Sequence, residues 1–214
     1  MTGILFDLDG TLLDTLEDLL DATNYALRAH GFPERTLKEL RRFVGNGAYN
    51  QMRLSVPEGT APEIVEKVLD TYKPYYTAHC QKKTRPYAGI PEALSVLGET
   101  WPIAIVSNKP DAAVKALCAD YFPGIYALGE AADCPRKPAP DMVYKAMQAI
   151  GCDRCVYVGD SEVDVLTAGH AGVPCLAVTW GFRDREDLEE AGAVDFCEEP
   201  GKIVKKIEEI IHGK

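Results

Sequence analysis

Three short apolar runs in this chain each stop abruptly at polar side chains, and this pattern restricts the fold more than any other feature. The runs and the residues that follow them are Ile4-Leu5-Phe6 before Asp7-Leu8-Asp9-Gly10-Thr11, Ile103-Ala104-Ile105-Val106 before Ser107-Asn108-Lys109, and Val156-Tyr157-Val158 before Gly159-Asp160-Ser161. Such runs are typical of strands buried on both faces of a parallel sheet. The carboxyl ends of parallel strands meet at one edge, where ligands bind. The sequence therefore predicts a parallel sheet with a functional site at that edge.

Segments with helical spacing separate the runs. Beyond residue 86 the expected helices cover 91–97, 111–121, 141–150 and 163–171, the expected strands cover 103–106, 125–128, 156–159 and 173–178, and an amphipathic helix over 203–211 closes the chain. This alternation is typical of a parallel sheet with helices on both faces. The predicted fold class is α/β, with a doubly wound, Rossmann-like core.

Residues 16–83 carry no convincing strand pattern. Apolar residues recur there at helical spacing over 16–27 and again over 64–72. Thr60 and Glu63 have the spacing of a capping box at the start of the second helix. A stretch of this length is too long for a loop in a compact domain. It predicts a small helical domain, and a chain of 214 residues fits one α/β domain with such an insertion.

The chain is acidic, with a net charge of −10 from 23 basic and 33 acidic residues. This charge disfavours nucleic acid and anionic membrane surfaces as partners, because both would be repelled at long range. Any anionic substrate would have to be attracted by local cations or a metal. No segment approaches the roughly 20 apolar residues that span a bilayer, and the first strand begins almost at Met1, which leaves no cleavable leader. The expected location is the cytoplasm, with the chain a monomer or a dimer.

The seven cysteines are irregularly spaced, as expected for reduced thiols. Only Cys152 and Cys155 stand at a spacing typical of metal or redox pairs. Because no second such pair exists and a strand begins directly after them, we interpret both as free thiols in a loop between helix and strand.

Four segments together resemble the haloacid dehalogenase superfamily. The family pattern is DxDGT, then a serine that closes a strand, then a lysine, and then a strand that ends in Gly-Asp before a further acid. In this chain the matching segments, in the same order, are Asp7-Leu8-Asp9-Gly10-Thr11, Ser107, Lys137 within Arg136-Lys137-Pro138, and Gly159-Asp160 with Asp164. Shorter matches look like the phosphoglycolate phosphatase branch: Asp14-Thr15, Val44-Gly45-Asn46-Gly47-Ala48 and Asn108-Lys109-Pro110. The resemblance covers nearly the whole chain.

The resemblance implies a helical cap inserted after the first motif, with the cap over 16–83 and the catalytic core over 1–15 and 84–214. It implies that Asp7 is a nucleophile that forms an aspartyl-phosphate, which divides hydrolysis into two easier steps. Asp9 would protonate the leaving oxygen and then deprotonate the attacking water. In a regular strand these two residues point to the same face.

The same resemblance implies Mg²⁺ as cofactor, since Mg²⁺ prefers an octahedron of hard oxygen ligands. The carboxylates of Asp7 and Asp160 and the backbone carbonyl of Asp9 would bind the metal. Asp164 would orient water on the metal from outside this ligand set, and it also has the spacing of a capping box with Ser161. The phosphoryl group would be bound by Ser107, Asn108 and Lys137.

The leading function is thus a Mg²⁺-dependent phosphatase for a small phosphorylated metabolite, with phosphoglycolate the first substrate to test. One alternative is a sugar phosphomutase, another phosphotransferase or a pyrophosphatase of the same superfamily. The first helix of the cap lacks the histidine expected of such a mutase. A phosphate-binding module without catalysis is a further alternative, although Asp7, Asp9 and Lys137 are all intact.

Recognition of a carboxylate on the substrate would need a cation outside the phosphoryl site. Arg41, Arg42 and Arg53 are the nearest basic residues to the Gly45-Asn46-Gly47 segment, and we expect one of them to bind that carboxylate. The glycine segment itself fits a loop that approaches substrate or a simple turn between helices.

Overall fold

The computed structural model describes residues 1–213. Its centre is a six-stranded sheet in the order β5-β4-β1-β6-β7-β8, in which every pairing is parallel. The strands are β1 (Thr2–Phe6), β4 (Ile103–Pro110), β5 (Tyr126–Glu130), β6 (Arg154–Gly159), β7 (Cys175–Val178) and β8 (Asp195–Cys197). The predicted α/β class with a doubly wound parallel sheet is confirmed.

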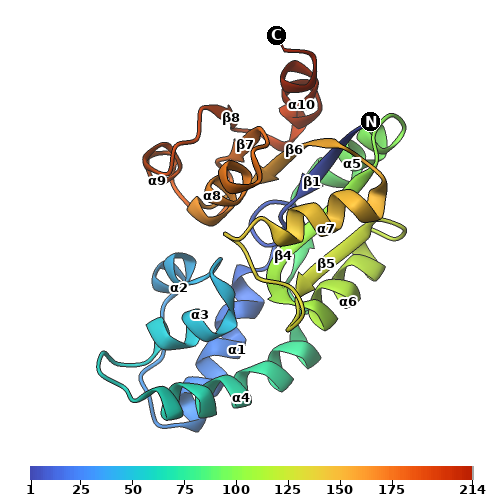
Figure 1. Ribbon diagram of the computed structural model, residues 1–214. Coiled ribbons are helices and arrows are strands. Elements are labelled where there is room, and N and C mark those ends of the chain that lie inside the picture. The colour runs from blue at the N-terminus through green and yellow to red at the C-terminus, as the bar shows by residue number, and fades with distance from the viewer. Residues whose placement is uncertain (214) are drawn as a thin grey trace.

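Strand β1 lies between β4 and β6 and fixes the position of the motifs. Its last residue, Phe6, is paired with Ile105 on one side and Val158 on the other. Strands β1 and β6 therefore end at nearly the same height, and β4 passes alongside that point, so the polar residues of the three motifs are brought together there. In Figure 1, β1 runs from the N-terminus toward the helices of residues 16–83.

Alternate residues of β1 pack against helices on opposite faces of the sheet. Ile4 and Phe6 belong to a core cluster that includes side chains of α5, α6 and α10, whereas Leu5 packs with side chains of α7 and α8. The helices of the core are α5 (Ile90–Gly98), α6 (Asp111–Tyr121), α7 (Asp141–Ile150), α8 (Glu162–Ala171), α9 (Arg185–Glu190) and α10 (Ile203–His212). Burial on both faces explains why the strands read as continuous apolar runs.

Four helices follow β1 and form an insert below the sheet in Figure 1: α1 (Leu16–Ala29), α2 (Leu37–Phe43), α3 (Gly47–Ser55) and α4 (Pro62–His79). The predicted helical insertion is confirmed. Two short antiparallel strands, β2 (Leu13–Asp14) and β3 (Arg85–Pro86), pair where the chain leaves and re-enters the core. We propose the boundaries predicted from the sequence, 16–83 for the insert and 1–15 with 84–214 for the core.

Asp18 ties this junction together. Its carboxylate is buried and accepts hydrogen bonds from the backbone N–H groups of Lys83 and Thr84, both at 2.9 Å. The side chain thus joins the start of α1 to the segment that returns to the core, 66 residues later.

Several local expectations differ from the structure. The Thr60–Glu63 capping box is wrong: α4 begins at Pro62, which is favoured at the first helical position, so Glu63 is one residue too early, and the Thr60 hydroxyl instead donates to the carbonyl of Pro57 at 2.6 Å. Strand β4 continues to Pro110, four residues beyond the expected end. Helix α9 and strand β8 were not expected.

All seven cysteines are free, with Cys155 buried in β6 and Cys152 in the preceding loop. No helix within residues 1–213 is long and apolar enough to cross a bilayer.

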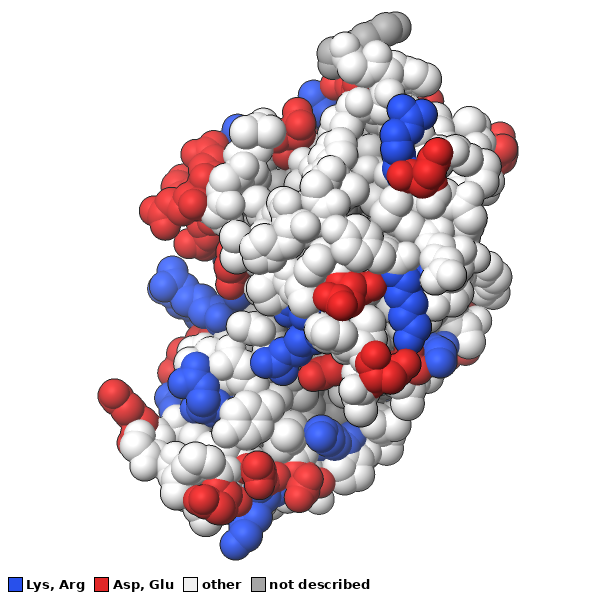
Figure 2. All heavy atoms as spheres, in the orientation of Figure 1, with Lys and Arg blue, Asp and Glu red and all other residues white. Residues whose placement is uncertain are grey.

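Charges of opposite sign meet at the junction of core and insert. On the face shown in Figure 2, acidic side chains gather over α9 of the core and basic ones over α2 of the insert. Arg41 of α2 forms an ion pair with Asp184, just before α9, at 3.1 Å. This pairing favours the approach of the insert to the core.

Candidate active site

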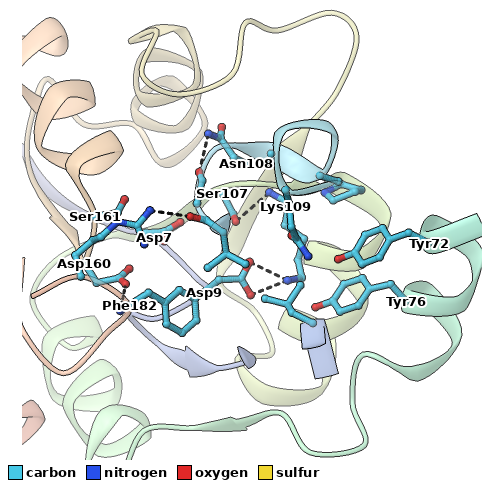
Figure 3. Close-up of a pocket in the computed structure, with 18 residues that line it drawn as sticks. Asp7, Asp9, Tyr72, Tyr76, Ser107, Asn108, Lys109, Asp160, Ser161 and Phe182 are labelled. Atoms are coloured by element: carbon cyan, nitrogen blue, oxygen red, sulfur yellow. Dashed lines mark hydrogen bonds and ion pairs between the residues drawn. The ribbon is translucent and has the colours of Figure 1, made fainter. Parts of the chain in front are cut away.

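A pocket of about 50 Å³ lies where the carboxyl ends of the strands face the insert. The core contributes residues from all three motif strands, and the insert contributes side chains of α1, α3 and α4 (Figure 3). One water needs roughly 10–15 Å³ by this measure of volume. The pocket is therefore suited to a compact ligand.

Asp7 and Asp9 both line this pocket, and each is paired with its own lysine. Lys137 Nζ donates to Asp7 Oδ1 at 2.7 Å, while Lys109 Nζ donates to both oxygens of Asp9 at 2.6 and 2.8 Å. Gly10 turns the chain directly after Asp9 with a φ of 87°, a region that favours glycine. A Cβ atom at Gly10 would also overlap the carboxylate of Asp160.

Lys137 is almost fully buried, behind Asp7. Its ammonium also donates to Asp164 Oδ1 at 2.7 Å and to the Tyr157 hydroxyl at 3.0 Å. Burial disfavours the charge, but Asp164 and Asp7 outweigh it and hold the pKa of Lys137 well above its ordinary value. The lysine is therefore a fixed positive charge behind the carboxylates.

Asp160 follows β6 and is held by two donors. The Thr11 hydroxyl donates to Oδ1 at 3.0 Å, and the backbone N–H of Phe182 donates to Oδ2 at 2.7 Å. Asp164 forms the predicted capping box with Ser161 at the start of α8, which is confirmed. Asp164 Oδ2 makes the capping bonds to Ser161, and these hold the side chain so that Oδ1 accepts a hydrogen bond from Lys137.

The carboxylates of Asp7, Asp160 and Asp164 form a buried cluster with one oxygen of each within 4.8 Å of the others. Burial, together with the charge of Asp164, raises the pKa of Asp160 to about 7. Burial likewise raises the pKa of Asp7, although Lys137 opposes this effect. One ammonium pairs with Asp7 and Asp164 and none with Asp160, so the three carboxylates carry an excess of negative charge when they are ionised. These residues fit a small divalent cation with oxygen ligands.

Ser107 and Asn108 lie at the same edge, in β4. Ser107 Oγ accepts a hydrogen bond from the backbone N–H of Lys109 at 3.2 Å, which leaves its own O–H available. Asn108 binds the backbone of Lys137 twice, at 2.9 Å each, and its Nδ2 also donates to the carbonyl of Gly45 in the insert at 3.2 Å. Asn108 therefore positions Lys137 and connects the core to the insert.

The expectation that Arg41, Arg42 or Arg53 reaches the substrate is wrong, because none of these side chains lines the pocket. The Arg41 guanidinium donates to the carbonyl of Gly181 at 3.0 Å, and Arg53 is bonded to Asn50 on its own helix. Arg42 is exposed. Proximity to the glycine segment along the chain did not reveal which way these helical side chains point.

The glycine segment does line the pocket, through Gly45 and Gly47. The loop that approaches substrate is thus the better of its two interpretations. Helix α3 begins at Gly47, and its N-cap Asn46 makes no side-chain capping bond. Free N–H groups at a helix start favour anions.

Several pocket residues were given no role from the sequence, among them Lys109, Arg183, Tyr72 and Tyr76. Lys109 lies within Asn108-Lys109-Pro110, one of the short matches to the phosphoglycolate phosphatase branch, so the sequence did contain a signal for this residue. From the sequence, the tyrosines fit the apolar face of a helix. That they also line a pocket depends on how the core packs against this helix. Arg183 has no local pattern at all.

Comparison with known proteins shows the family of the chain. Residues 4–178 match the model of the haloacid dehalogenase-like hydrolase family. A phosphoglycolate phosphatase of Mesorhizobium japonicum is 35% identical over 197 residues, which cover 87% of this chain and 86% of the relative. One from Cereibacter sphaeroides is 36% identical over 192 residues, covering 86% and 87%.

A crystal structure from Lactobacillus delbrueckii subsp. bulgaricus, provisionally assigned as a phosphoglycolate phosphatase, has a TM-score of 0.91 and 36% sequence identity. It covers 96% of this chain and 97% of its own. The chain belongs to the haloacid dehalogenase-like hydrolase family. Within that family it is similar to phosphoglycolate phosphatases, and its cluster of three aspartates is consistent with a metal site.

Proposed function

We propose that this protein is a Mg²⁺-dependent phosphatase that hydrolyses a small phosphate monoester through an aspartyl-phosphate on Asp7, with phosphoglycolate as the leading substrate. The observation that carries the proposal is the arrangement of Asp7: a buried carboxylate at the end of β1, bonded to Lys137 and clustered with two further carboxylates. The similarity to phosphoglycolate phosphatases over most of the chain supports the substrate.

In this proposal Asp7 attacks phosphorus and the ester oxygen leaves. The bond of Lys137 to Asp7 Oδ1 leaves Oδ2 as the attacking atom. The ammonium of Lys137 reduces the repulsion between the carboxylate and the anionic phosphoryl group. Fixed charges of this kind act where charge is transferred in the transition state and need no reorganisation.

Asp9 is proposed as the acid that protonates the leaving oxygen and then as the base that activates water against the aspartyl-phosphate. Its carboxylate borders the same pocket as that of Asp7. Proton transfer by a positioned side chain contributes about 10²–10⁴-fold to the rate. Each of the two acids therefore has a separate task.

Asp7 and Asp160 are the proposed carboxylate ligands of Mg²⁺, together with the backbone carbonyl of Asp9. When bound, the ion neutralises the phosphoryl oxygens and orients them. Thr11 and the N–H of Phe182 orient Asp160 for this role. Asp164 is not one of the proposed ligands. It is bonded to Lys137 and Ser161 and lies next to the metal site.

Ser107, Asn108 and Lys137 are proposed to bind the phosphoryl group. The free O–H of Ser107 donates to a phosphoryl oxygen, while Asn108 holds the chain at Lys137 in place. The acidic net charge supports the expectation that neither nucleic acid nor a membrane surface is a partner. The substrate is accordingly a small phosphorylated metabolite.

The test is a panel of small phosphate esters, including phosphoglycolate, hexose phosphates and pyrophosphate, assayed for phosphate release with and without Mg²⁺. We expect phosphoglycolate to give the highest kcat/KM, and no turnover without the metal. Conversion of a hexose phosphate into its isomer, without phosphate release, would assign the protein to the mutases instead. Release of phosphate from pyrophosphate alone would assign it to the pyrophosphatases.

A further inference from the structure

Lys109 places a buried positive charge between Asp9 and the insert. Its side chain is only 3% exposed, and Nζ lies 4.8 Å from the centre of the Tyr76 ring in α4. Two of its three N–H donors account for the bonds to Asp9. One donor remains for another acceptor in the pocket.

The hydroxyl group of Tyr76 is buried and has no hydrogen-bond partner, although the residue lines the pocket. Its ring stacks on that of Tyr72 with centroids 5.4 Å apart, and both hydroxyls point toward Lys109 and Asp9 (Figure 3). Burial, and after it the charge of Asp9, raise the pKa of Tyr76 well above its ordinary value. The hydroxyl therefore remains a donor, and a buried donor without a partner is costly unless a ligand provides an acceptor.

The other cations near the pocket already have several partners. Lys137 already donates to Asp7, Asp164 and Tyr157 and belongs to the proposed phosphoryl site, away from the rest of the substrate. The Arg183 guanidinium is bonded to Glu162 and to backbone carbonyls of the insert. Lys109 has Asp9 as its one ion-pair partner within residues 1–213.

We propose that Lys109 and the Tyr76 hydroxyl bind a second anionic group of the substrate, a carboxylate, and thereby select substrates that carry one. The inference rests on the proposed function, because a phosphoryl group at Asp7 directs its leaving oxygen to Asp9 and the remainder of the substrate toward Lys109. As the ester oxygen approaches Asp9, the third N–H group of Lys109, which is not bonded to Asp9, donates to the carboxylate.

The dimensions of the site fit a carboxylate close to the ester oxygen. In phosphoglycolate a single methylene group separates the two, and Lys109 Nζ lies only 2.6 Å from the nearer oxygen of Asp9. The apolar side chains of Leu19 and Ala48 also line the pocket and reduce competition from water. A charge-assisted bond is stronger in such surroundings.

The test compares phosphoglycolate with phosphoglycolamide, in which a neutral amide of nearly the same shape replaces the carboxylate. For the wild type with Mg²⁺ we expect kcat/KM to be higher for phosphoglycolate. In Lys109→Met this preference should fall by about 10- to 100-fold, as expected for one lost charge-assisted hydrogen bond. Lys115→Met is the matched control, because Lys115 is exposed on α6. This variant should prefer phosphoglycolate over the amide as strongly as the wild type does.

Tyr76→Phe provides a second variant in case Lys109→Met does not fold. The lost hydroxyl is buried without a partner in the protein, so the free energy of unfolding should be equal to or higher than that of the wild type, while the preference for phosphoglycolate should fall several-fold. Equal losses for both esters in these variants would overturn the inference, because Lys109 would then serve Asp9 alone. So would a wild type without preference between the esters. A wild type that releases phosphate from no ester would overturn the proposed function itself.

Discussion

Arg183 donates a hydrogen bond from Nη2 to the backbone carbonyl of Val44 at 2.9 Å, across the boundary between core and insert. Its Nη1 donates to the carbonyl of Arg41 at 2.7 Å, and Glu162 pairs with its Nε. Helix α2 ends at this point, where carbonyl groups lack intrahelical partners. One buried arginine of the core thus satisfies the end of a helix in the insert and holds the insert over the pocket.

Arg183→Met should weaken this contact, because it removes a charged donor from two carbonyls and from Glu162. We expect a loss of about 1–3 kcal/mol in the free energy of unfolding and a KM for phosphoglycolate raised more than kcat is lowered. Urea denaturation and steady-state kinetics measure the two effects. The control is Arg28→Met, which removes an exposed arginine paired only with Glu34. Identical kinetics for both variants would contradict a role for Arg183 in closing the pocket.

Lys137→Met should be destabilising as well as inactive. The change leaves Asp7 and Asp164 buried without their shared counter-ion, a defect that costs about 3–5 kcal/mol in comparable buried pairs. Added Mg²⁺ should restore part of this loss, since the ion can neutralise Asp7. The measurement is urea denaturation with and without Mg²⁺. A variant as stable as the wild type would show that the lysine is not needed to balance the carboxylates.

Mg²⁺ should stabilise the protein more at pH 8 than at pH 6. The pKa of Asp160 is about 7 in the folded chain, above its ordinary value of 3.8, so the metal-free protein loses stability as the pH rises from about 4 to 7. The metal binds the ionised carboxylate and competes with the proton, so its stabilising effect grows over the upper part of this range. The increase in Tm on adding Mg²⁺, recorded at both pH values, tests this. Asp160→Asn should reduce this pH dependence to the part that Asp7 contributes, because burial raises the pKa of that carboxyl too. An equal Tm increase at both pH values for the wild type would contradict the prediction.

The parallel core could be predicted because its signals are local. Apolar runs mark the strands, and the residues that end them, such as Asp7 and Ser107, need only a parallel arrangement to meet. The exact ends of helices were harder to predict, because one neighbouring residue can change them. The predicted cap at Thr60 is an example, since α4 begins at Pro62 instead.

Contacts between residues far apart in the chain could not be predicted from sequence. Lys109 and Asp9 are separated by 100 residues, and Arg183 and Val44 by 139. No periodicity indicates that a lysine in the core lies against Tyr76, or that Arg41 turns toward Gly181 instead of the pocket. These contacts arise only when the insert packs against the core.

The central claim is that Asp7 is phosphorylated during turnover. It is tested most directly by quenching the wild type and Asp7→Asn in acid during hydrolysis of phosphoglycolate, with Mg²⁺ or with excess chelator, and searching the peptides for a phosphoryl group. We expect phosphate release and a phosphorylated Asp7 peptide only for the wild type with Mg²⁺. Turnover near the wild-type rate by Asp7→Asn, or full turnover in chelator, would contradict the account.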